Sequence, residues 1–227
     1  EELLKQYDFI LFLETSGLSL IDINYSNTKP IKVDFSSAPI NYRIKYGGGR
    51  NQLIAKAIGL KTVKNLNIID ATAGLGQDSL IFASLGANVV MLERSPIIHA
   101  LLHDGLYRAA KDKKIEPIIS KMQLLQKDST NYLNDLKNKV DVIYIDPMFP
   151  KRSKSSLVKK EMRIFRKLVG DDVDASVLLN TALKKAKYRV VVKRPKNALH
   201  INDCKPNFKL SGKSSRFDIY TIEKLIK

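Results

Sequence analysis

The sequence predicts an α/β fold built on a mostly parallel sheet, because of its alternating pattern and one glycine-rich turn. From residue 67 onward, short apolar runs with strand character alternate with segments of helical spacing. The first of these runs ends at Asp70 and leads into Ala71-Thr72-Ala73-Gly74-Leu75-Gly76, a small-residue turn that opens a helix. In an open sheet of this kind, with helices on both faces, a nucleotide-like ligand lies beside the carboxyl ends of the strands.

The chain begins with a small β-rich unit that ends in a linker. Three strands are predicted there, at residues 7–13, 18–23 and 30–35. Residues 43–50 contain three consecutive glycines and several basic side chains, which is typical of a flexible connector. We therefore expect two units: an N-terminal β unit with its linker at 1–50, and the main domain at 51–227.

The main domain alternates strands and helices along its whole length. Strands are predicted at residues 67–71, 88–92, 122–126, 140–145 and 188–193, followed by a closing pair at 206–211 and 216–223. Helices are predicted at 51–58, 77–85, from 95 onward, at 130–137 and at 175–186. Ser95 is expected to cap the long helix, with Pro96 at its first position, and Asp128-Ser129 to cap the next.

The composition indicates which partners and which cellular compartment to expect. The 227 residues include 39 Lys and Arg against 23 Asp and Glu, a formal net charge of +16 that indicates a polyanion such as nucleic acid. Cys204 is the single cysteine, which excludes an intrachain disulfide and fits a reducing compartment. No apolar run approaches the roughly 20 residues that span a bilayer. We expect a cytoplasmic protein without a membrane segment.

Acidic residues follow four consecutive predicted strands. They are Asp70, Glu93, Asp128 and Asp146. Because the carboxyl ends of parallel strands meet at one edge of the sheet, these carboxylates should gather around the glycine turn. An acid after the second strand, as Glu93 is, suits hydrogen bonding to ribose hydroxyls.

The glycine turn favours S-adenosylmethionine over a dinucleotide. Gly74 and Gly76 lack the third glycine of the dinucleotide pattern, and Gln77-Asp78 follows instead. The carboxylate of Asp78 at the start of a helix would repel a pyrophosphate. S-adenosylmethionine carries an ammonium, a sulfonium and a ribose but no phosphate. Arg94 beside Glu93 is expected to pair with a carboxylate or to face the adenine.

The segment Asp146-Pro147-Met148-Phe149-Pro150 is similar to the turn of methyltransferases that modify exocyclic amines. Such an amine is a poor nucleophile, because its lone pair is delocalised into the aromatic ring. Asp146 and the carbonyl of Pro147 could accept its two N–H groups and aim the nitrogen at the methyl donor. Phe149 could stack on an extruded base, so Asp146, Pro147 and Phe149 are the predicted catalytic residues.

From about residue 30 to its end, the chain resembles the RsmJ family of bacterial 16S ribosomal RNA guanine-N2 methyltransferases. The motifs that carry the resemblance are Lys45-Tyr-Gly-Gly-Gly-Arg50, Asp70-Ala-Thr-Ala-Gly-Leu-Gly-Gln-Asp78, Met91-Leu-Glu-Arg94, Asp104-Gly-Leu106, Asp146-Pro-Met-Phe-Pro150, Leu157-Val-Lys-Lys-Glu-Met-Arg163, Val191-Val-Lys-Arg-Pro195 and Arg216-Phe-Asp-Ile-Tyr220. The resemblance implies a class I, Rossmann-like methyltransferase fold with a seven-stranded sheet. It also implies methyl transfer from S-adenosylmethionine to a guanine in 16S ribosomal RNA or in the small ribosomal subunit.

The resemblance also implies the cofactor contacts. Carried over by motif, these fall at Gln77, Asp78, Glu93, Arg94, Asp128, Ser129 and Asp146, beside Asp70, Gly74 and Gly76 of the turn. Gln77 stands where the family commonly has arginine, and Asp128-Ser129 where it commonly has two serines. Both differences could alter the affinity for the cofactor.

Basic residues around the predicted site are the candidates for RNA contact. They are Arg43, Lys45, Arg50, Lys151, Arg152, Lys154, Lys159, Lys160, Arg163, Lys193 and Arg194. The run after Phe149 also has an apolar face, so an amphipathic helix with a solvated basic side is equally compatible with it. No metal site is expected, because His99 and His103 lack the glutamate and the third ligand of a zinc helix.

Two other functions remain compatible with the residues. An adenine-N6 methyltransferase acting on RNA or DNA would use the same turn, since that turn holds either amine. A methyltransferase-like fold that binds RNA without chemistry is the alternative from another class, although the intact Asp146–Phe149 motif argues against it. A dehydrogenase is disfavoured by the missing third glycine.

Overall fold

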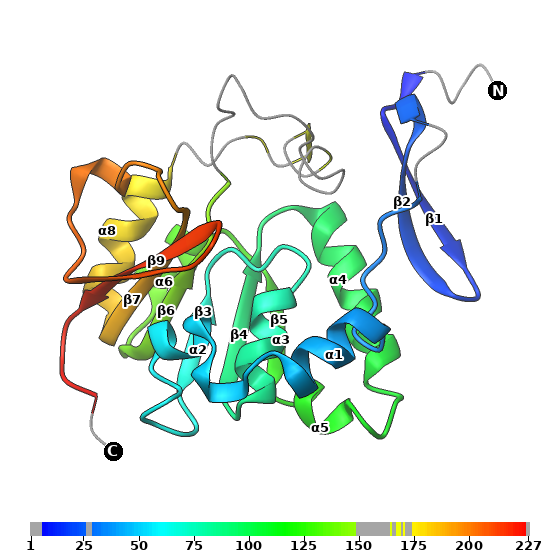
Figure 1. Cartoon of the computed structure of the whole chain (residues 1–227). Coiled ribbons are helices and arrows are strands. Elements are labelled where there is room, and N and C mark those ends of the chain that lie inside the picture. The colour runs from blue at the N-terminus through cyan, green and yellow to red at the C-terminus, as the bar shows by residue number, and fades with distance from the viewer. Residues whose placement is uncertain are drawn as a thin grey trace.

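The computed structural model of the chain describes residues 6–25, 29–148 and 174–225, together with Ile164, Lys167, Leu168 and Gly170. A seven-stranded sheet with helices on both faces forms its centre (Figure 1). A separate two-stranded hairpin extends beyond helix α4. This is the α/β architecture that the alternating sequence pattern predicted.

The strands of the large sheet occur in the order β5-β4-β3-β6-β7-β9-β8. Their bounds are β3 (Asn67–Asp70), β4 (Asn88–Glu93), β5 (Met122–Gln126), β6 (Val140–Ile145), β7 (Ala186–Pro195), β8 (Phe208–Ser211) and β9 (Ser215–Thr221). Strands β5 to β7 run parallel, whereas β9 is antiparallel to both of its neighbours. β4 and β5 lie on one side of β3, and β6 and β7 on the other. The strand order therefore reverses at β3, where open sheets of this kind bind their ligands.

Helices connect these strands. Their bounds are α1 (Ala38–Tyr46), α2 (Leu53–Ile58), α3 (Gln77–Ser84), α4 (Pro96–Ala109), α5 (Glu116–Ile119), α6 (Ser129–Asp135) and α8 (Ala175–Lys185), with 3-10 turns η2 (Ile23–Tyr25), η3 (Gly49–Asn51) and η4 (Ile201–Asp203). The predicted caps are confirmed: the Ser95 hydroxyl accepts from the amide of Ile98, and the Asp128 carboxylate from that of Asn131. The short helix α5 was not anticipated.

Alternate residues of each central strand face opposite sides of the sheet. Ile68 and Val142 join the core under α2, α3 and α4, whereas Ile69 and Ile143 join the core under α6 and α8. All four side chains are almost fully buried. Burial on both faces explains why the strands are continuous apolar runs rather than alternating ones.

The predicted third N-terminal strand is wrong. The hairpin itself is confirmed, with β1 (Phe9–Glu14) antiparallel to β2 (Gly17–Asp22). Residues 30–35 contribute only one isolated bridge, between Leu20 and Ile31, although Ile31, Val33 and Phe35 are buried. The alternation in this segment reflects packing rather than sheet pairing. Pro30 has no amide hydrogen to donate, and the carbonyl of Val33 accepts from the Arg108 guanidinium instead of a strand.

The predicted linker is also wrong in its first half. Residues 43–46 of the predicted linker belong to helix α1, and the glycines that follow lead directly into η3. Ile40 and Ile44, four residues apart, pack against the core and give this helix its inner face. The division of the chain into units at 1–50 and 51–227 stays a prediction.

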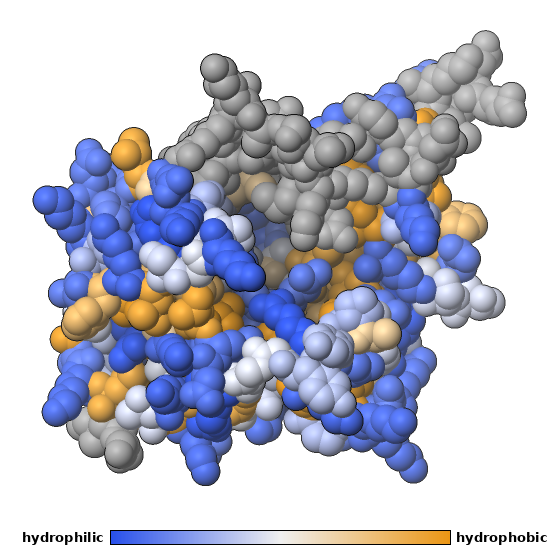
Figure 2. Space-filling view, viewed as in Figure 1, coloured by the Kyte–Doolittle hydropathy of each residue, from blue (hydrophilic) through white to orange (hydrophobic). Residues whose placement is uncertain are grey.

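The surface around these elements is mainly polar. Figure 2 shows hydrophilic side chains over most of one face, with hydrophobic surface in recesses between them. Within the residues that the structure describes, no helix combines the length and the apolarity needed to cross a bilayer.

Candidate active site

A cavity of about 650 Å³ opens at the carboxyl ends of the central strands. The predicted cofactor and catalytic residues that line it are Asp70, Gly74, Gln77, Asp78, Glu93, Arg94, Asp128, Ser129, Asp146 and Pro147. Three predicted RNA contacts, Arg43, Lys193 and Arg194, line it as well. Residues at the ends of β3, β4, β6 and β7 and at the starts of α3 and α6 thus meet in one place. The volume lies in the range of small-molecule sites.

Asp70 shapes the glycine turn from inside. Its carboxylate accepts from the Thr72 amide at 3.1 Å and from the Ser79 hydroxyl at 2.6 Å, and its side chain is almost fully buried. Burial raises the pKa of Asp70 from 3.8 to about 7, although the hydrogen bonds from Ser79 and Thr72 oppose that rise. The structure therefore gives Asp70 a role in holding the turn.

The two glycines of the turn have different roles. Gly74 has a φ of 53°, lines the cavity, and donates its amide to Glu93 Oε2 at 3.1 Å. Gly76, with a φ of 70°, is not among the cavity residues. A Cβ atom there would lie 2.8 Å from Leu102 Cδ1 and 3.2 Å from Phe35 Cζ. Gly76 is therefore required for packing α3 against the core.

Glu93 and its neighbour form the wall at the end of β4. Glu93 accepts from the Ser95 amide at 2.8 Å as well as from Gly74, and only 7% of it is exposed. These two amides fix the direction of its carboxylate beside the turn. Arg94 pairs with Asp174 at 2.9 Å, which agrees with the expectation that Arg94 meets a carboxylate.

Asp128 and Ser129 join the end of β5 to the end of β3. Asp128 Oδ1 accepts from the Asn131 amide at 2.9 Å. The hydroxyl of Ser129 donates to the carbonyl of Ala71 at 2.6 Å. Asp128 thus caps its own helix α6, Ser129 connects that helix to the end of β3, and both residues line the cavity.

Thr72 links the two motifs that the sequence singled out. The amide of Asp146 donates to Thr72 Oγ1 at 2.6 Å, so the hydroxyl sits between the glycine turn and the end of β6. Sequence reasoning missed Thr72, because a threonine within a small-residue turn has no distinctive pattern. The contact fixes the backbone of Asp146 relative to the turn.

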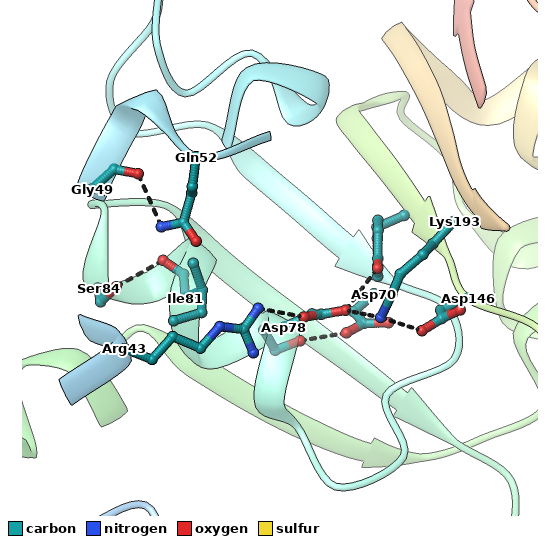
Figure 3. Close-up of polar contacts among 11 residues, drawn as sticks. Arg43, Gly49, Gln52, Asp70, Asp78, Ile81, Ser84, Asp146 and Lys193 are labelled. Atoms are coloured by element: carbon teal, nitrogen blue, oxygen red, sulfur yellow. Dashed lines mark hydrogen bonds and ion pairs between the residues drawn. The ribbon is translucent and has the colours of Figure 1, made fainter. Parts of the chain in front are cut away.

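A network of charges crosses the floor of the cavity (Figure 3). Asp78 Oδ1 pairs with Arg43 at 3.0 Å, and Asp78 Oδ2 accepts from Lys193 at 2.8 Å and from the Tyr144 hydroxyl at 2.7 Å. Lys193 also donates to Asp146 Oδ2 at 2.7 Å. The network therefore connects α1, the start of α3, and the ends of β6 and β7.

The titration of these groups follows from their surroundings. Burial opposes ionisation of Asp78, but the Lys193 charge, hydrogen bonds from Lys193 and Tyr144, and Arg43 together lower its pKa below 3.8. Burial also opposes the charge on Lys193, yet Asp146 and Asp78 outweigh it and raise its pKa above 10.5. Asp78 is therefore ionised and Lys193 protonated at neutral pH.

Tyr144 is a second site residue that sequence reasoning missed. Burial, followed by the charges of Asp78, Asp146 and Asp70, raises the pKa of Tyr144 well above 10.0, so its hydroxyl stays a donor. The signal was a tyrosine between Ile143 and Ile145, in the apolar half of its strand. A buried phenol needs a hydrogen-bond partner, and here the partner is Asp78.

Four of the predicted RNA contacts have hydrogen-bond partners inside the protein: Arg43, Arg50, Lys193 and Arg194. Arg43 and Lys193 bind the carboxylates of the cavity network, and Arg50 donates to the carbonyls of Leu60 and Leu85 at 2.6 and 2.7 Å. Contact of these residues with RNA phosphates stays a prediction. Lys45 is exposed on α1. Phe149, Lys151, Arg152, Lys154, Lys159, Lys160 and Arg163 lie outside the described residues.

Arg194, near the end of β7, lines the cavity and belongs to a largely buried cluster of charged residues. Only 7% of it is exposed, and it donates to the carbonyl of Leu199; burial lowers its pKa from 12.5 to about 10. Beside it, Arg216 forms a two-point contact with Asp218 at 2.8 and 3.0 Å and donates to the carbonyls of Lys196 and Ala198. These bonds hold the segment that follows Pro195, the last residue of β7, which lines the cavity.

Comparisons with known proteins agree with this geometry. A family model described as putative SAM-dependent methyltransferase matches residues 2–222. A protein of Marinobacter nauticus named ribosomal RNA small subunit methyltransferase J is 49% identical, over 97% of this chain and 80% of the relative. A protein of the same name from Dechloromonas aromatica is 50% identical, over 94% of this chain and 87% of the relative.

Solved structures share the fold. The crystal structure of a SAM-dependent methyltransferase from Neisseria gonorrhoeae is 37% identical, with a TM-score of 0.72, and the match covers 90% of this chain and 78% of that one. A 16S rRNA N2 G1207 methyltransferase from T. thermophilus, solved with AdoMet and guanosine, is 15% identical with a TM-score of 0.52, over 95% of this chain and 50% of that one. At that identity the second likeness shows the fold alone.

Proposed function

Because this chain belongs to the ribosomal RNA small subunit methyltransferase J family, we propose that it methylates the exocyclic N2 amine of a guanine in 16S ribosomal RNA. The methyl donor is S-adenosylmethionine, and the substrate is the RNA itself or a small ribosomal subunit. The observation that carries the proposal is the position of Asp146. It stands at the cavity, with its backbone bonded to the glycine turn through Thr72 and its carboxylate bonded to Lys193.

The side chains of the cavity suit this methyl donor. Glu93 is held at the end of β4, where a carboxylate reaches ribose hydroxyls. Helix α3 begins with Gln77-Asp78, and the Asp78 carboxylate occupies the helix end that a pyrophosphate would need. Glu93 and Asp128 add carboxylates to the cavity beyond the two that Lys193 and Arg43 balance, which suits a ligand with an ammonium group. S-adenosylmethionine, when bound, supplies an electrophilic methyl group on its sulfonium.

Asp146 and Pro147 orient the acceptor. We infer that the Asp146 carboxylate and the Pro147 carbonyl accept the two N–H bonds of the target amine, which directs its nitrogen toward the methyl donor. Pro147 is buried and restricts the backbone, so these acceptors stay aligned. Phe149 is our candidate for stacking on the extruded base.

The exposed face of α1 is our candidate for RNA contact among the described residues. Tyr42 and Tyr46 are 66% and 61% exposed, with ring centroids 5.1 Å apart, and Lys45 lies between them in sequence. Helix α1 contains no acidic residue, and its Arg43 reaches the cavity. Exposed aromatic rings beside a cation stack on unpaired bases. The predicted basic residues between 151 and 163 remain candidates for phosphate contact, and an RNA substrate implies a cytoplasmic location.

A transfer assay tests the proposed function. Purified protein, labelled S-adenosylmethionine and small-subunit RNA or subunits lacking the mark should give labelled N2-methylguanosine, identified by nuclease digestion and mass spectrometry. Asp146→Ala should abolish transfer because the amine loses an acceptor. Asp135→Asn, an exposed carboxylate on α6, is the matched control and should retain the wild-type rate.

Each alternative has its own outcome in the same assay. N6-methyladenosine as the product would show an adenine methyltransferase. No transfer by the wild-type protein, with RNA binding intact, would show a binding module. Undiminished transfer by the Asp146→Ala variant would remove Asp146 from the mechanism.

A further inference from the structure

We propose that Lys193 is a positioning residue for methyl transfer, whose ammonium, anchored by Asp78, holds the Asp146 carboxylate in the orientation that receives the target amine. The inference rests on the proposed function and deepens it. It also replaces the expectation, drawn from sequence, that Lys193 contacts RNA phosphate.

The geometry ties Lys193 to two carboxylates on different elements. Its Nζ lies 2.7 Å from Asp146 Oδ2 and 2.8 Å from Asp78 Oδ2, and Figure 3 shows it between the two side chains. The Lys193 side chain is only 30% exposed. Two short charge-assisted bonds in different directions define where the ammonium sits, so it is not a freely moving surface charge.

Asp78, which anchors Lys193, is itself held by three hydrogen-bond donors. Besides Lys193, Asp78 is held by Arg43 from α1 and by the Tyr144 hydroxyl from β6, and its side chain is 13% exposed. A mobile carboxylate could not define the position of Lys193, but one held by three donors can. The orientation therefore passes from Asp78 through Lys193 to Asp146.

The charge balance of the network favours a positioning role for Lys193 over phosphate binding. Asp78 and Asp146 balance the charges of Lys193 and Arg43, so the network presents little excess positive charge to a polyanion. Two of the three N–H donors of Lys193 already point to carboxylates, and the negative charges of those carboxylates oppose the approach of a phosphate. Removing Lys193 would instead leave Asp78 and Asp146 close together without the cation that now lies between them.

The chemistry of the acceptor favours such a cation. An exocyclic amine is directed by an ionised carboxylate, and Asp146 serves only while it stays ionised and aimed. Lys193 stabilises that ionised form, and because it remains protonated it orients rather than removes a proton. The other ionisable groups that face this pair are Arg43 on α1, Asp70 on β3 and Tyr144 on β6.

Single-turnover rates of Lys193 variants test the proposal. At saturating RNA and S-adenosylmethionine, Lys193→Met should lower the transfer rate by about 10- to 100-fold, since a small misplacement of an orienting group has an effect of that size. The dissociation constant for RNA should change by less than about twofold, and its salt dependence should be unchanged. Lys193→Arg, which keeps the charge, should recover part of the rate.

The pH dependence of the transfer rate is a second readout, and it would not change if Lys193 had a purely structural role. Without the ammonium, Asp146 should take up a proton at higher pH, so the acidic limb of the rate profile of Lys193→Met should shift upward. Lys193→Gln gives a second variant if the methionine variant is unstable, with thermal unfolding and cofactor titration to establish the fold. Lys187→Met, an exposed lysine at the other end of β7, is the matched control and should behave like wild type.

The opposite pattern would overturn the inference. If Lys193→Met weakens RNA binding, lowers the salt dependence by about one ion and leaves the saturated rate unchanged, Lys193 is a phosphate contact. An unaltered rate, pH profile and RNA affinity would also reject the positioning role. If wild-type protein transfers no methyl group to RNA, it is the proposed function that fails.

Discussion

At the scale of single residues, burial decides the role of Asp70. As the last residue of β3, it was expected to contact the cofactor. The structure places it in the lining of the cavity and buries it, with Thr72 and Ser79 as hydrogen-bond donors. An internal carboxyl in apolar surroundings favours its neutral form, which is why the pKa rises to about 7. The protonation of Asp70 is thus linked to folding, and its contact with the cofactor stays a prediction.

Because of that linkage, the stability of the protein should depend on pH in a direction that the pKa of Asp70 sets. Below pH 3.8 Asp70 is protonated in both the folded and the unfolded protein. Between pH 3.8 and about 7 only the folded protein keeps this proton, so the free energy of unfolding falls as the pH rises. The slope from this group is at most about 1.4 kcal/mol per pH unit. Urea unfolding measures the free energy of unfolding of Asp70→Asn and of wild type across this range. The difference between the two should shift in favour of the variant as the pH rises to about 7 and then stay constant.

The comparison needs a control for general charge effects. Asp135→Asn, at an exposed position, should give a curve parallel to that of wild type. If Asp70→Asn also ran parallel to wild type, Asp70 would be ionised in the folded protein.

At the scale of elements, helix α1 has two faces with different roles. Ile40 and Ile44 pack inward, Arg43 pairs with Asp78 in the cavity, and Tyr42 and Tyr46 remain exposed. The helix therefore places two exposed aromatic rings next to the residue that reaches the active site. Stacking on bases depends on the ring and not on the hydroxyl.

Replacing both tyrosines of α1 tests this face. The double variant Tyr42→Ala/Tyr46→Ala should weaken RNA binding at least about fivefold, the lower end of the effect of one stacked base, with the salt dependence unchanged. The double phenylalanine variant should bind like wild type. Fluorescence anisotropy of labelled RNA measures both quantities.

Helix α4 supplies the matched control. Tyr107 is 59% exposed there, and Lys111 lies 4.0 Å from its ring, so it presents the same chemistry on a different element. Tyr107→Ala should leave RNA affinity unchanged. Equal losses in both variants would mean that α1 has no special part in binding.

At the scale of the whole molecule, the sheet order creates the site. β4 and β5 leave β3 in one direction and β6 and β7 in the other, so the chain cannot cover the ends of β3 and β6 with a direct connection. The cavity forms there, between two cores that pack on opposite faces of the sheet. A ligand in that cavity contacts several strands at once and should stabilise the whole fold.

Thermal unfolding measures that stabilisation. At about 100 times its dissociation constant, S-adenosylmethionine should add about 2.7 kcal/mol to the free energy of unfolding. For a chain of this size the melting temperature should rise by roughly 5–10 °C. NADH at the same concentration should produce no shift, because Asp78 occupies the helix end that a pyrophosphate would need. A comparable shift with NADH would show a dinucleotide site.

The sequence by itself determined the alternation of elements, the turn from Asp70 to Asp78 and the placement of acids at the strand ends. These features are local: they depend on side-chain period, glycine conformation and the residues that follow each strand. The parallel sheet then brings those ends to one edge, so most of the predicted cofactor residues do line one cavity. Gly76 is the exception, because its small size serves packing against Leu102.

The tertiary structure alone decided which partner each charge takes. Lys193 is 115 residues from Asp78 and 47 from Asp146, and a sequence pattern cannot distinguish a lysine that meets carboxylates from one that meets phosphate. The same holds for residues 30–35, whose alternation signals burial but does not say whether a strand lies beside them. Burial and long-range contacts set these outcomes, because the energy of a charge or an amide depends on what surrounds it in space.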